Sequence, residues 1–398
     1  MTVLIWVEFV AALWWGSTMI VLVASFIAAL AFPRPRRSQT GPAVLPPVTG
    51  IVPIKEFEFR FEETQSSLFA QIYPELEVLV ATSEVESPAS TAALRVQQRF
   101  PQVPSRIVRS ATDLAVSPKL NNLWVAVAEA RNDLILTKDS NVVLAPDDLE
   151  CFVRHFDAGV GLVSTIPVVT EPESLAAWIE ASLINCYYAR MLMLARAVGL
   201  GFGCGKIMLF RRSDIDRAGG FQSFAWALGE DAALADTMVR LGLRTVLADR
   251  VSRQPLGQRR FGDVWERQLR WKSIWRAQKP AVFAGALFGS VLLSALAGAV
   301  AAPLAGVAPL PAAAATFGFW FLLETLLCAF RGWPVSLWAP LAFLGREMLD
   351  LPVWFCALIG GEVKWAGRTY RPGKRSPPTP FVAEMKAAVR NVGPNDYP

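Results

Sequence analysis

Acidic side chains capable of chemistry gather at the end of one apolar run. The run begins at Asp133 and delivers Asp139, and Asn141 stands two residues later. At positions i and i+2 of an extended segment both side chains face the same side, so their oxygens could share a hard divalent cation that also binds a diphosphate. The ordinary alternative is that this Asp-Ser-Asn tripeptide only caps a loop or a helix.

Two adjacent carboxylates, Glu230 and Asp231, form the second acidic group. They follow a glycine-containing turn and open a helix-like stretch from Ala232 to Leu241. The ordinary alternative is that two acids at the start of a helix only favour the helix dipole.

Basic and amide side chains could complete a site for a nucleotide around these acids. Lys119 could offer an ammonium group to a phosphate, and Asn121 an amide to a base or a ribose. Arg267, Arg270 and Trp271 form a basic and aromatic box before a long apolar region. The alternatives are a helix start with a solvated lysine and a juxtamembrane helix with an interfacial tryptophan.

The composition points to a membrane protein. The chain has 398 residues, of which 53% are hydrophobic and only 18% charged, and a mean hydropathy of +0.35. This is too apolar for a disordered protein or an ordinary soluble enzyme. The net charge of +5 suits an anionic membrane face better than nucleic acid. The cysteines form no CxxC pair and His155 is the single histidine, which disfavours zinc sites, disulfide frameworks and Ser-His triads.

Apolar regions predict the membrane topology. No charge interrupts the 24 residues from Phe9 to Phe32, which is enough for a helix that crosses a bilayer. Arginines follow this run, so we expect the amino terminus outside and the following domain in the cytoplasm. Residues 280–330 carry Glu324 as their only charge and predict two spans, while residues 332–361 predict either a re-entrant or interfacial helix pair or a third span. The predicted units are a transmembrane helix at 1–33, a cytoplasmic domain at 34–279, a membrane region at 280–371 and a Pro-rich basic tail at 372–398.

The cytoplasmic domain must supply the elements that position the candidate residues. Short apolar runs alternate with helix-like stretches, which predicts an α/β fold with a mostly parallel sheet and helices on both faces. In such sheets ligands bind at the carboxyl ends of the strands. No GxGxxG or GxxxxGK[ST] sequence stands there, which disfavours the common phosphate loops. The predicted strands lie at 48–54, 77–82, 106–108 and 133–136, and the predicted helices at 61–70, 89–100 and 120–131.

In their order along the chain, these clusters resemble the processive and lipid-modifying inverting glycosyltransferases of the GT-A fold, which are related to family 2. The chain looks most like the ceramide glucosyltransferases of family 21. Ser117 to Leu123 resembles the family's NPKxNNL segment, and Arg211 to Gly220 resembles its RRxxLxxxGG segment. Arg346-Glu347 and Trp365 to Tyr370 are similar to its carboxyl end. The resemblance covers roughly residues 5 to 372.

The resemblance implies a role for each matching residue. Asp231, with Glu230 beside it, would be the general base. Asp139 and Asn141 would hold Mg²⁺ or Mn²⁺. The expected donor-binding residues are Lys55, Glu84, Glu86, Lys119, Asn121, Asp139, Arg267, Arg270 and Trp271.

Two departures from the family pattern stand out. Glu84 and Glu86 lie where the family usually has an aspartate that contacts uridine. Asn141 replaces the second aspartate of the family's DxD motif. Because an amide oxygen is neutral, we expect weaker binding of a divalent cation.

The function implied by the resemblance is transfer of a sugar from a UDP-sugar, for which we expect UDP-glucose, to the primary hydroxyl of a lipid, for which we expect ceramide. The expected location is a bacterial inner membrane, and nucleic acid is not an expected partner. The apolar stretch from Leu183 to Leu200 predicts an interfacial helix that guides the acceptor, or a plain core helix. The alternatives are another lipid acceptor, such as a hopanoid polyol or diacylglycerol, with UDP-GlcNAc or UDP-galactose, and an inactive membrane receptor of the same fold. The sequence leaves the oligomeric state open.

Overall fold

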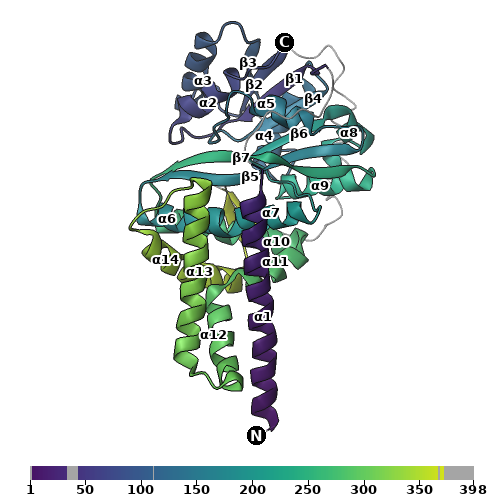
Figure 1. The fold of residues 1–398 in the computed structure, drawn as a ribbon. Helices are drawn as coiled ribbons and strands as arrows, with labels where there is room; N and C mark the ends of the chain where they lie inside the picture. Colours follow the sequence, from purple (N-terminus) through teal and green to yellow (C-terminus); the bar gives the residue numbers. More distant parts are fainter. Residues whose placement is uncertain (1, 34–43, 111, 366–367, 372–398) are drawn as a thin grey trace.

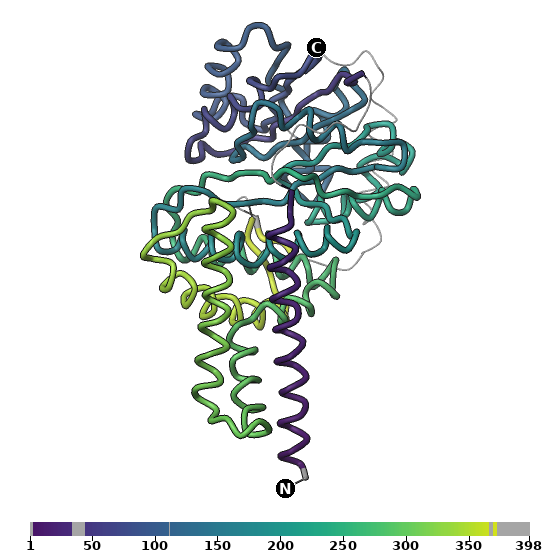
Figure 2. The backbone as a smooth tube through the Cα atoms, viewed as in Figure 1, coloured from purple at the N-terminus to yellow at the C-terminus, as the bar shows by residue number. Residues whose placement is uncertain are grey.

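The computed structural model describes residues 2–33, 44–110, 112–365 and 368–371. Within them, a mixed α/β domain stands on a group of long apolar helices, and the amino terminus lies at the far end of that group (Figure 1, Figure 2). The predicted Pro-rich tail at 372–398 lies outside the described residues. The α/β fold and the apolar helices predicted from the sequence are confirmed.

A sheet of seven strands forms the centre of the α/β domain, in the order β3-β2-β1-β4-β6-β5-β7. The strands β3, β2, β1 and β4 pair in parallel, whereas β6 runs antiparallel to both β4 and β5. The order reverses between β1 and β4, and such a switch point is where α/β sheets bind ligands. The strands are β1 (Val48–Pro53), β2 (Leu76–Thr82), β3 (Ser105–Arg109), β4 (Leu134–Lys138), β5 (Val160–Pro172), β6 (Ile207–Arg211) and β7 (Arg244–Gly257).

Helices cover both faces of this sheet. Three of them, α2, α3 and α5, share an apolar core with one face, and α4, α8 and α9 share a core with the other. Every residue of β2 is buried, as a parallel strand covered on both faces requires. The four strands and three helices that the sequence predicted are present. The helices are α2 (Phe61–Phe69), α3 (Pro88–Arg99), α4 (Pro118–Ala128), α5 (Asp148–Arg154), α8 (Arg212–Arg217) and α9 (Glu230–Arg240).

Strong capping signals begin two of these helices. The side chains of Ser87 and Ser117 each accept a hydrogen bond from the main-chain N–H three residues later, and a proline follows each serine. A serine cap followed by proline favours a helix start because the cap satisfies a main-chain donor and proline already has a helical φ. In α4 this start places Lys119 in the first turn, at the carboxyl end of the sheet.

Long apolar helices extend away from the α/β domain. The helices α1 (Thr2–Ala31) and α13 (Pro309–Arg331) are each long and apolar enough to cross a membrane. The helix α12 (Val291–Ala301) packs beside both of them (Figure 1). A preceding segment, residues 280–289, meets the segment 291–305 at a bend of 60°, and the two together could form a further span.

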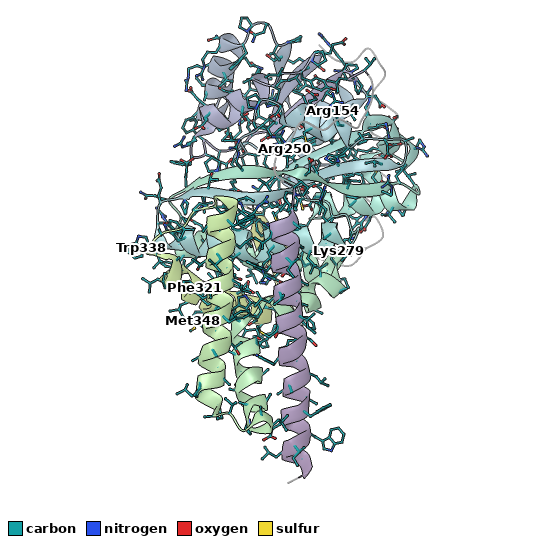
Figure 3. The ribbon with its side chains drawn as sticks, in the orientation of Figure 1. Arg154, Arg250, Lys279, Phe321, Trp338 and Met348 are labelled. Atoms are coloured by element: carbon teal, nitrogen blue, oxygen red, sulfur yellow. The ribbon has the colours of Figure 1, made fainter. Side chains whose placement is uncertain are left out.

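A layer of helices separates the sheet from the apolar helices (Figure 1). The strand β5 leads into α6, the π-helical segment η1 and α7, while β7 leads into α10. The helix α14 packs against α6 and α10, and the exposed side chains of Met348 in this helix and of Trp338 just before it lie at the outer edge of this layer (Figure 3). The predicted stretch at 183–200 falls in η1 and α7, which contact β5 and α1. These elements are α6 (Leu175–Ala181), η1 (Ser182–Ala189), α7 (Arg190–Ala197), α10 (Phe261–Gln278) and α14 (Ala339–Ile359).

A buried group of charges joins this layer to the apolar helices. Arg346 of α14 lies 2.7 Å from Glu324 of α13 and 2.8 Å from its neighbour Glu347. Arg190 of α7 lies 3.6 Å from Glu324. Glu347 also accepts a 2.9 Å hydrogen bond from the main-chain N–H of Val291 and so caps α12. All four charged side chains are nearly inaccessible, so each charge depends on its partners.

We expect Arg346→Met to destabilise the protein by about 3 to 5 kcal/mol, because it leaves two buried carboxylates without their main partner. The measurement is the midpoint of thermal unfolding in detergent, compared with the parent protein. A double variant, Arg346→Met with Glu324→Gln, removes one of the stranded charges and should recover part of the loss. A single variant as stable as the parent would contradict this account.

Candidate active site

The site begins where β4 ends and β6 begins. Because β6 pairs antiparallel with β4, Lys138 lies opposite Ile207, and the residues just beyond them, Asp139 and Lys206, are neighbours. The main-chain N–H of Asp139 donates to the carbonyl of Lys206 at 3.0 Å. Antiparallel pairing therefore brings a lysine beside the carboxylate that the sequence singled out.

Asp139 is held between two ammonium groups. Its Oδ1 lies 2.6 Å from Lys119 Nζ, and its Oδ2 lies 3.1 Å from Lys206 Nζ. Burial alone would raise the pKa of Asp139, but the two lysines outweigh it and hold that pKa below its ordinary value. Burial alone would lower the pKa of Lys119, but Asp139 and Glu230 hold it above the ordinary value. Burial lowers the pKa of Lys206, an effect that Asp139 opposes.

Glu230 and Asp231 open α9 next to this ion pair. Glu230 lies 3.4 Å from Lys119 Nζ and accepts a 3.1 Å hydrogen bond from the hydroxyl of Ser117. Asp231 accepts main-chain N–H groups from Gly205 at 2.9 Å and from Ala232 at 2.7 Å. Burial raises the pKa of both carboxyl groups, against the lowering effects of Lys119 and of the main-chain donors. A carboxyl group with a raised pKa is a stronger base than a solvated one, which suits proton abstraction from a hydroxyl.

Gly205 lies against Lys119, Glu230 and Asp231. Its carbonyl accepts a 2.5 Å hydrogen bond from Lys119 Nζ. A Cβ at this position would lie 3.2 Å from Lys119 Nζ, 3.3 Å from Asp231 Oδ2 and 3.5 Å from Glu230 Oε1. The absence of a side chain at Gly205 therefore leaves room for the charged groups to converge.

The oxygens expected to bind a cation have other partners. Asn141 Oδ1 accepts from Lys206 Nζ at 3.0 Å, and Asn141 Nδ2 donates to Glu58 at 2.8 Å. Ser140 donates to the second oxygen of Glu58 at 2.5 Å. Because Asp139 and Asn141 both turn an oxygen toward one ammonium group, this donor set, as it is arranged, does not fit a divalent cation shared by the two residues.

The helix α10 brings arginines to the edge of the site. Arg267 lies 2.9 Å from the buried Glu180 of α6, and its charge lowers the pKa of Lys206. Arg270 lies over the ring of Trp365 at 5.1 Å, and burial, followed by the charge of Arg267, lowers its pKa to about 10. The charges of Arg267 and Arg270 thus act on Lys206 and Glu230 of the site, whereas the ring of Trp271 packs in the helical layer, 6.0 Å from that of Tyr188.

The other four predicted donor-binding residues lie in the loops after β1 and β2 and in α4. Lys55 follows β1 and is exposed, and Glu84 and Glu86 are exposed in the loop after β2. Asn121 is buried, and its amide group exchanges two hydrogen bonds with the main chain of Ala115, at 2.7 Å and 2.8 Å. Its side chain fixes the loop before α4, while a contact of any of the four with a nucleotide stays a prediction.

Sequence reasoning missed Lys206, Gly205 and Glu58. Lys206 and Gly205 end a run of alternating glycines, Gly201 to Gly205, which signals close approach of the main chain to other groups. Glu58 stands in a segment with no chemical motif, so its contact with Asn141 had no local signal.

Two other clusters in the described part of the chain do not compete with this site. An apolar cavity between η1, α13 and α14 has a volume of about 40 Å³, far below the several hundred Å³ of a nucleotide-sugar pocket. Cys151, His155 and Asp249 place their polar atoms within 4.8 Å of one another. Burial and the hydrogen bond to Asp249 raise the pKa of the Cys151 thiol to about 12, and Arg250 (Figure 3) pairs beside it with Asp147 at 2.6 Å, so this group is disposed against cation binding.

The fold defines the class of the protein. The structure matches a mannosyltransferase from Pyrobaculum calidifontis, solved with GDP-Man and Mn²⁺, with a TM-score of 0.54 and 21% identity over 86% of this chain and 99% of that one. At this identity the likeness concerns the fold, which is that of the GT-A glycosyltransferases.

The family follows from the sequence. Residues 16–375 match the model of glycosyl transferase family 21, and the chain belongs to that family. It is similar to ceramide glucosyltransferase 1 of Caenorhabditis elegans, with 23% identity over 59% of this chain, a match that spans about half (51%) of the relative. It is also similar to ceramide glucosyltransferase 3 of the same organism, with 21% identity over 82% of this chain and 72% of the relative. The predicted family and the assignment as a glycosyltransferase are thereby confirmed.

Gly205→Ala should lower turnover roughly tenfold, because the added Cβ pushes Lys119 and Asp231 apart by a few tenths of an ångström at the reacting centre. The measurement is the steady-state rate of sugar transfer. Gly262→Ala in α10 is the matched control, since a Cβ there meets nothing within 4 Å. Equal rates for the two variants would show that the close approach at Gly205 has no part in catalysis.

Proposed function

We propose that this glycosyltransferase moves glucose from UDP-glucose to the primary hydroxyl of ceramide, with inversion at the anomeric carbon. The observation that carries the proposal is the paired carboxylate of Glu230 and Asp231 beside the ion pair of Lys119 and Asp139, at the switch point of the sheet. The ceramide glucosyltransferases among its relatives support the acceptor and the sugar.

The proposed reaction transfers one proton to Asp231 and leaves negative charge on the departing diphosphate. The hydroxyl oxygen of the lipid attacks the anomeric carbon from the face opposite the diphosphate, and Asp231 takes the hydroxyl proton. The bond between the anomeric carbon and the diphosphate oxygen breaks, and the nucleoside diphosphate leaves with that electron pair. Lys119, Arg267 and Arg270 lie where they would offset the negative charge that develops on the leaving group.

The position of the layer formed by α6, η1, α10 and α14 supports the proposal that the acceptor is a lipid. The basic box of α10 lies in this layer, and its Arg267 contacts Glu180 of α6. Because this layer lies between the sheet and the apolar helices, a lipid hydroxyl at the membrane surface would reach the site without leaving the bilayer (Figure 1). We place the catalytic domain on the cytoplasmic side of a bacterial inner membrane, since arginines follow α1 in the sequence.

The divalent cation that the family resemblance implies stays a prediction, and the arrangement of its expected ligands does not favour it. The solved mannosyltransferase carries Mn²⁺ together with its nucleotide sugar, which supports a divalent cation in this fold. The expected ligands of Mg²⁺ or Mn²⁺, Asp139 and Asn141, both turn an oxygen toward Lys206, so no step of the proposed reaction is assigned to a cation.

The direct test of the proposed function is a transfer assay with purified protein in detergent. Labelled UDP-glucose, UDP-galactose and UDP-GlcNAc are each combined with ceramide, diacylglycerol and a hopanoid polyol. Labelled glucosylceramide is the expected main product. A labelled product with another lipid would overturn the acceptor assignment, and the absence of any labelled lipid or released UDP would overturn the activity.

Asp231→Asn should lower turnover at least 100-fold while binding of UDP changes little, because the amide cannot accept the hydroxyl proton. Turnover is measured by product formation and UDP binding by calorimetry. Asp236→Asn, on an outer turn of the same helix, is the control because its ion pair with Lys279 is partly exposed. Near-normal turnover of Asp231→Asn would rule out its role as the base.

The pH dependence should report the raised pKa of this carboxyl pair. A base works only when ionised, so activity is present above its pKa and is lost as the pH falls through it. Because burial raises the pKa of Asp231, the acid limb should lie above the ordinary carboxyl range of about 4. Lys119 lowers this pKa, so Lys119→Met should move the limb to higher pH. The check is the profile of kcat/KM against pH, and a limb that Lys119→Met leaves in place would contradict the assignment.

A further inference from the structure

We propose that the ammonium group of Lys206 takes the place of a divalent cation in this enzyme and binds the leaving diphosphate of the donor, so that transfer proceeds without an added metal. The proposal rests on the proposed function, because it assigns a residue to the diphosphate of a nucleotide sugar.

The position of Lys206 Nζ is that of a shared cation. It lies 3.1 Å from Asp139 Oδ2 and 3.0 Å from Asn141 Oδ1. These oxygens belong to positions i and i+2 after β4, the pair that would chelate a cation. The ammonium group therefore occupies the point between the two ligands.

The other contacts close this place to a metal ion. Lys119 Nζ holds Asp139 Oδ1 at 2.6 Å, so both oxygens of that carboxylate face positive charges. The carboxylate of Glu58 accepts hydrogen bonds from Asn141 Nδ2 and Ser140 Oγ. A divalent ion on Asp139 would have to displace an ammonium group and would then be repelled by the other.

The charge of the donor set explains why a monovalent group is enough. Protein sites hold Mg²⁺ through one or two carboxylates together with substrate phosphates, and here Asp139 is the single carboxylate of the pair because Asn141 supplies a neutral oxygen. Asp139 alone carries one negative charge against the two positive charges of Lys119 and Lys206. Around these three side chains Glu58 and Glu230 add negative charge and Arg267 adds positive charge, so the attraction for a diphosphate comes from the Lys206 ammonium group itself.

Lys206 is placed to act on a phosphate. Its main chain is fixed by the 3.0 Å hydrogen bond between its carbonyl and the N–H of Asp139, and its side chain is only 16% exposed. An ammonium group has three N–H donors. The contacts with Asp139 and Asn141 use two of them, and the third can donate to a phosphate oxygen. Lys206 remains protonated throughout the reaction, while the hydroxyl proton goes to Asp231 and the diphosphate leaves with the electron pair of the broken bond.

The first measurement is binding of UDP to protein stripped of metal and kept in EDTA. The parent protein should bind UDP, Lys206→Met should bind it at least tenfold more weakly, and Lys206→Arg should keep most of the binding because it keeps the charge. Lys279→Met is the matched control, since Lys279 lies at the start of the apolar region (Figure 3) and pairs with Asp236. UDP binding by the parent that requires Mn²⁺ or Mg²⁺ would overturn the proposal.

The second measurement tests whether two substitutions turn the site into one that needs a metal ion. In Lys206→Met combined with Asn141→Asp, the methionine frees the point between the ligands and the aspartate restores a second carboxylate, so UDP binding should become dependent on Mn²⁺. The double variant would count against the proposal if it bound UDP equally with and without Mn²⁺. Both measurements use UDP alone and need no lipid. A failure of the lipid transfer assay would therefore overturn the proposed function without changing what the UDP-binding measurements say about Lys206.

Discussion

The ion pair between Asp139 and Lys119 is the interaction on which the site depends. A carboxylate that is three-quarters buried must be compensated, since an unpaired charge in that position would cost several kcal/mol. Lys119 also contacts Glu230 and the carbonyl of Gly205. One ammonium group thereby links the end of β4 and the starts of β6 and α9 to α4, so these elements cannot shift independently.

Further contacts connect the sheet that carries the site to the long apolar helices. The strands β5 and β7 lead into the helices of the interfacial layer, and the hydroxyl of Ser174 donates to the carbonyl of Arg259 at 2.9 Å, which joins their exits. The buried charges around Arg346 then fix this layer to α13. A reacting centre on the sheet is thus tied rigidly to helices of membrane length, which is what an enzyme needs if its acceptor is confined to a bilayer.

The parallel half of the fold could be predicted from the sequence, because apolar runs alternate there with helices that begin at capped serines. The remaining strands could not. The strand β7 contains Arg244 and Arg250, which obscure its pattern, and the direction of β6 has no local signal because it depends on pairing with β4. The structure brings Lys119, Asp139 and Glu230 together as candidates, and their catalytic roles stay predictions. Lys206 was not predicted for the same reason as β6: the antiparallel register with β4, which the sequence does not reveal, sets which residue lies beside it.

Asn141 and Lys206 are better understood together than apart. Taken alone, an amide in place of a second carboxylate is a weakened metal ligand. Beside Lys206, the same amide avoids a surplus of negative charge around an ammonium group and still provides an acceptor at 3.0 Å. A carboxylate at position 141 would draw Lys206 into a second ion pair and weaken its attraction for a phosphate. The neutral side chain therefore leaves the ammonium group partly uncompensated, and that residual charge is available to an anionic donor.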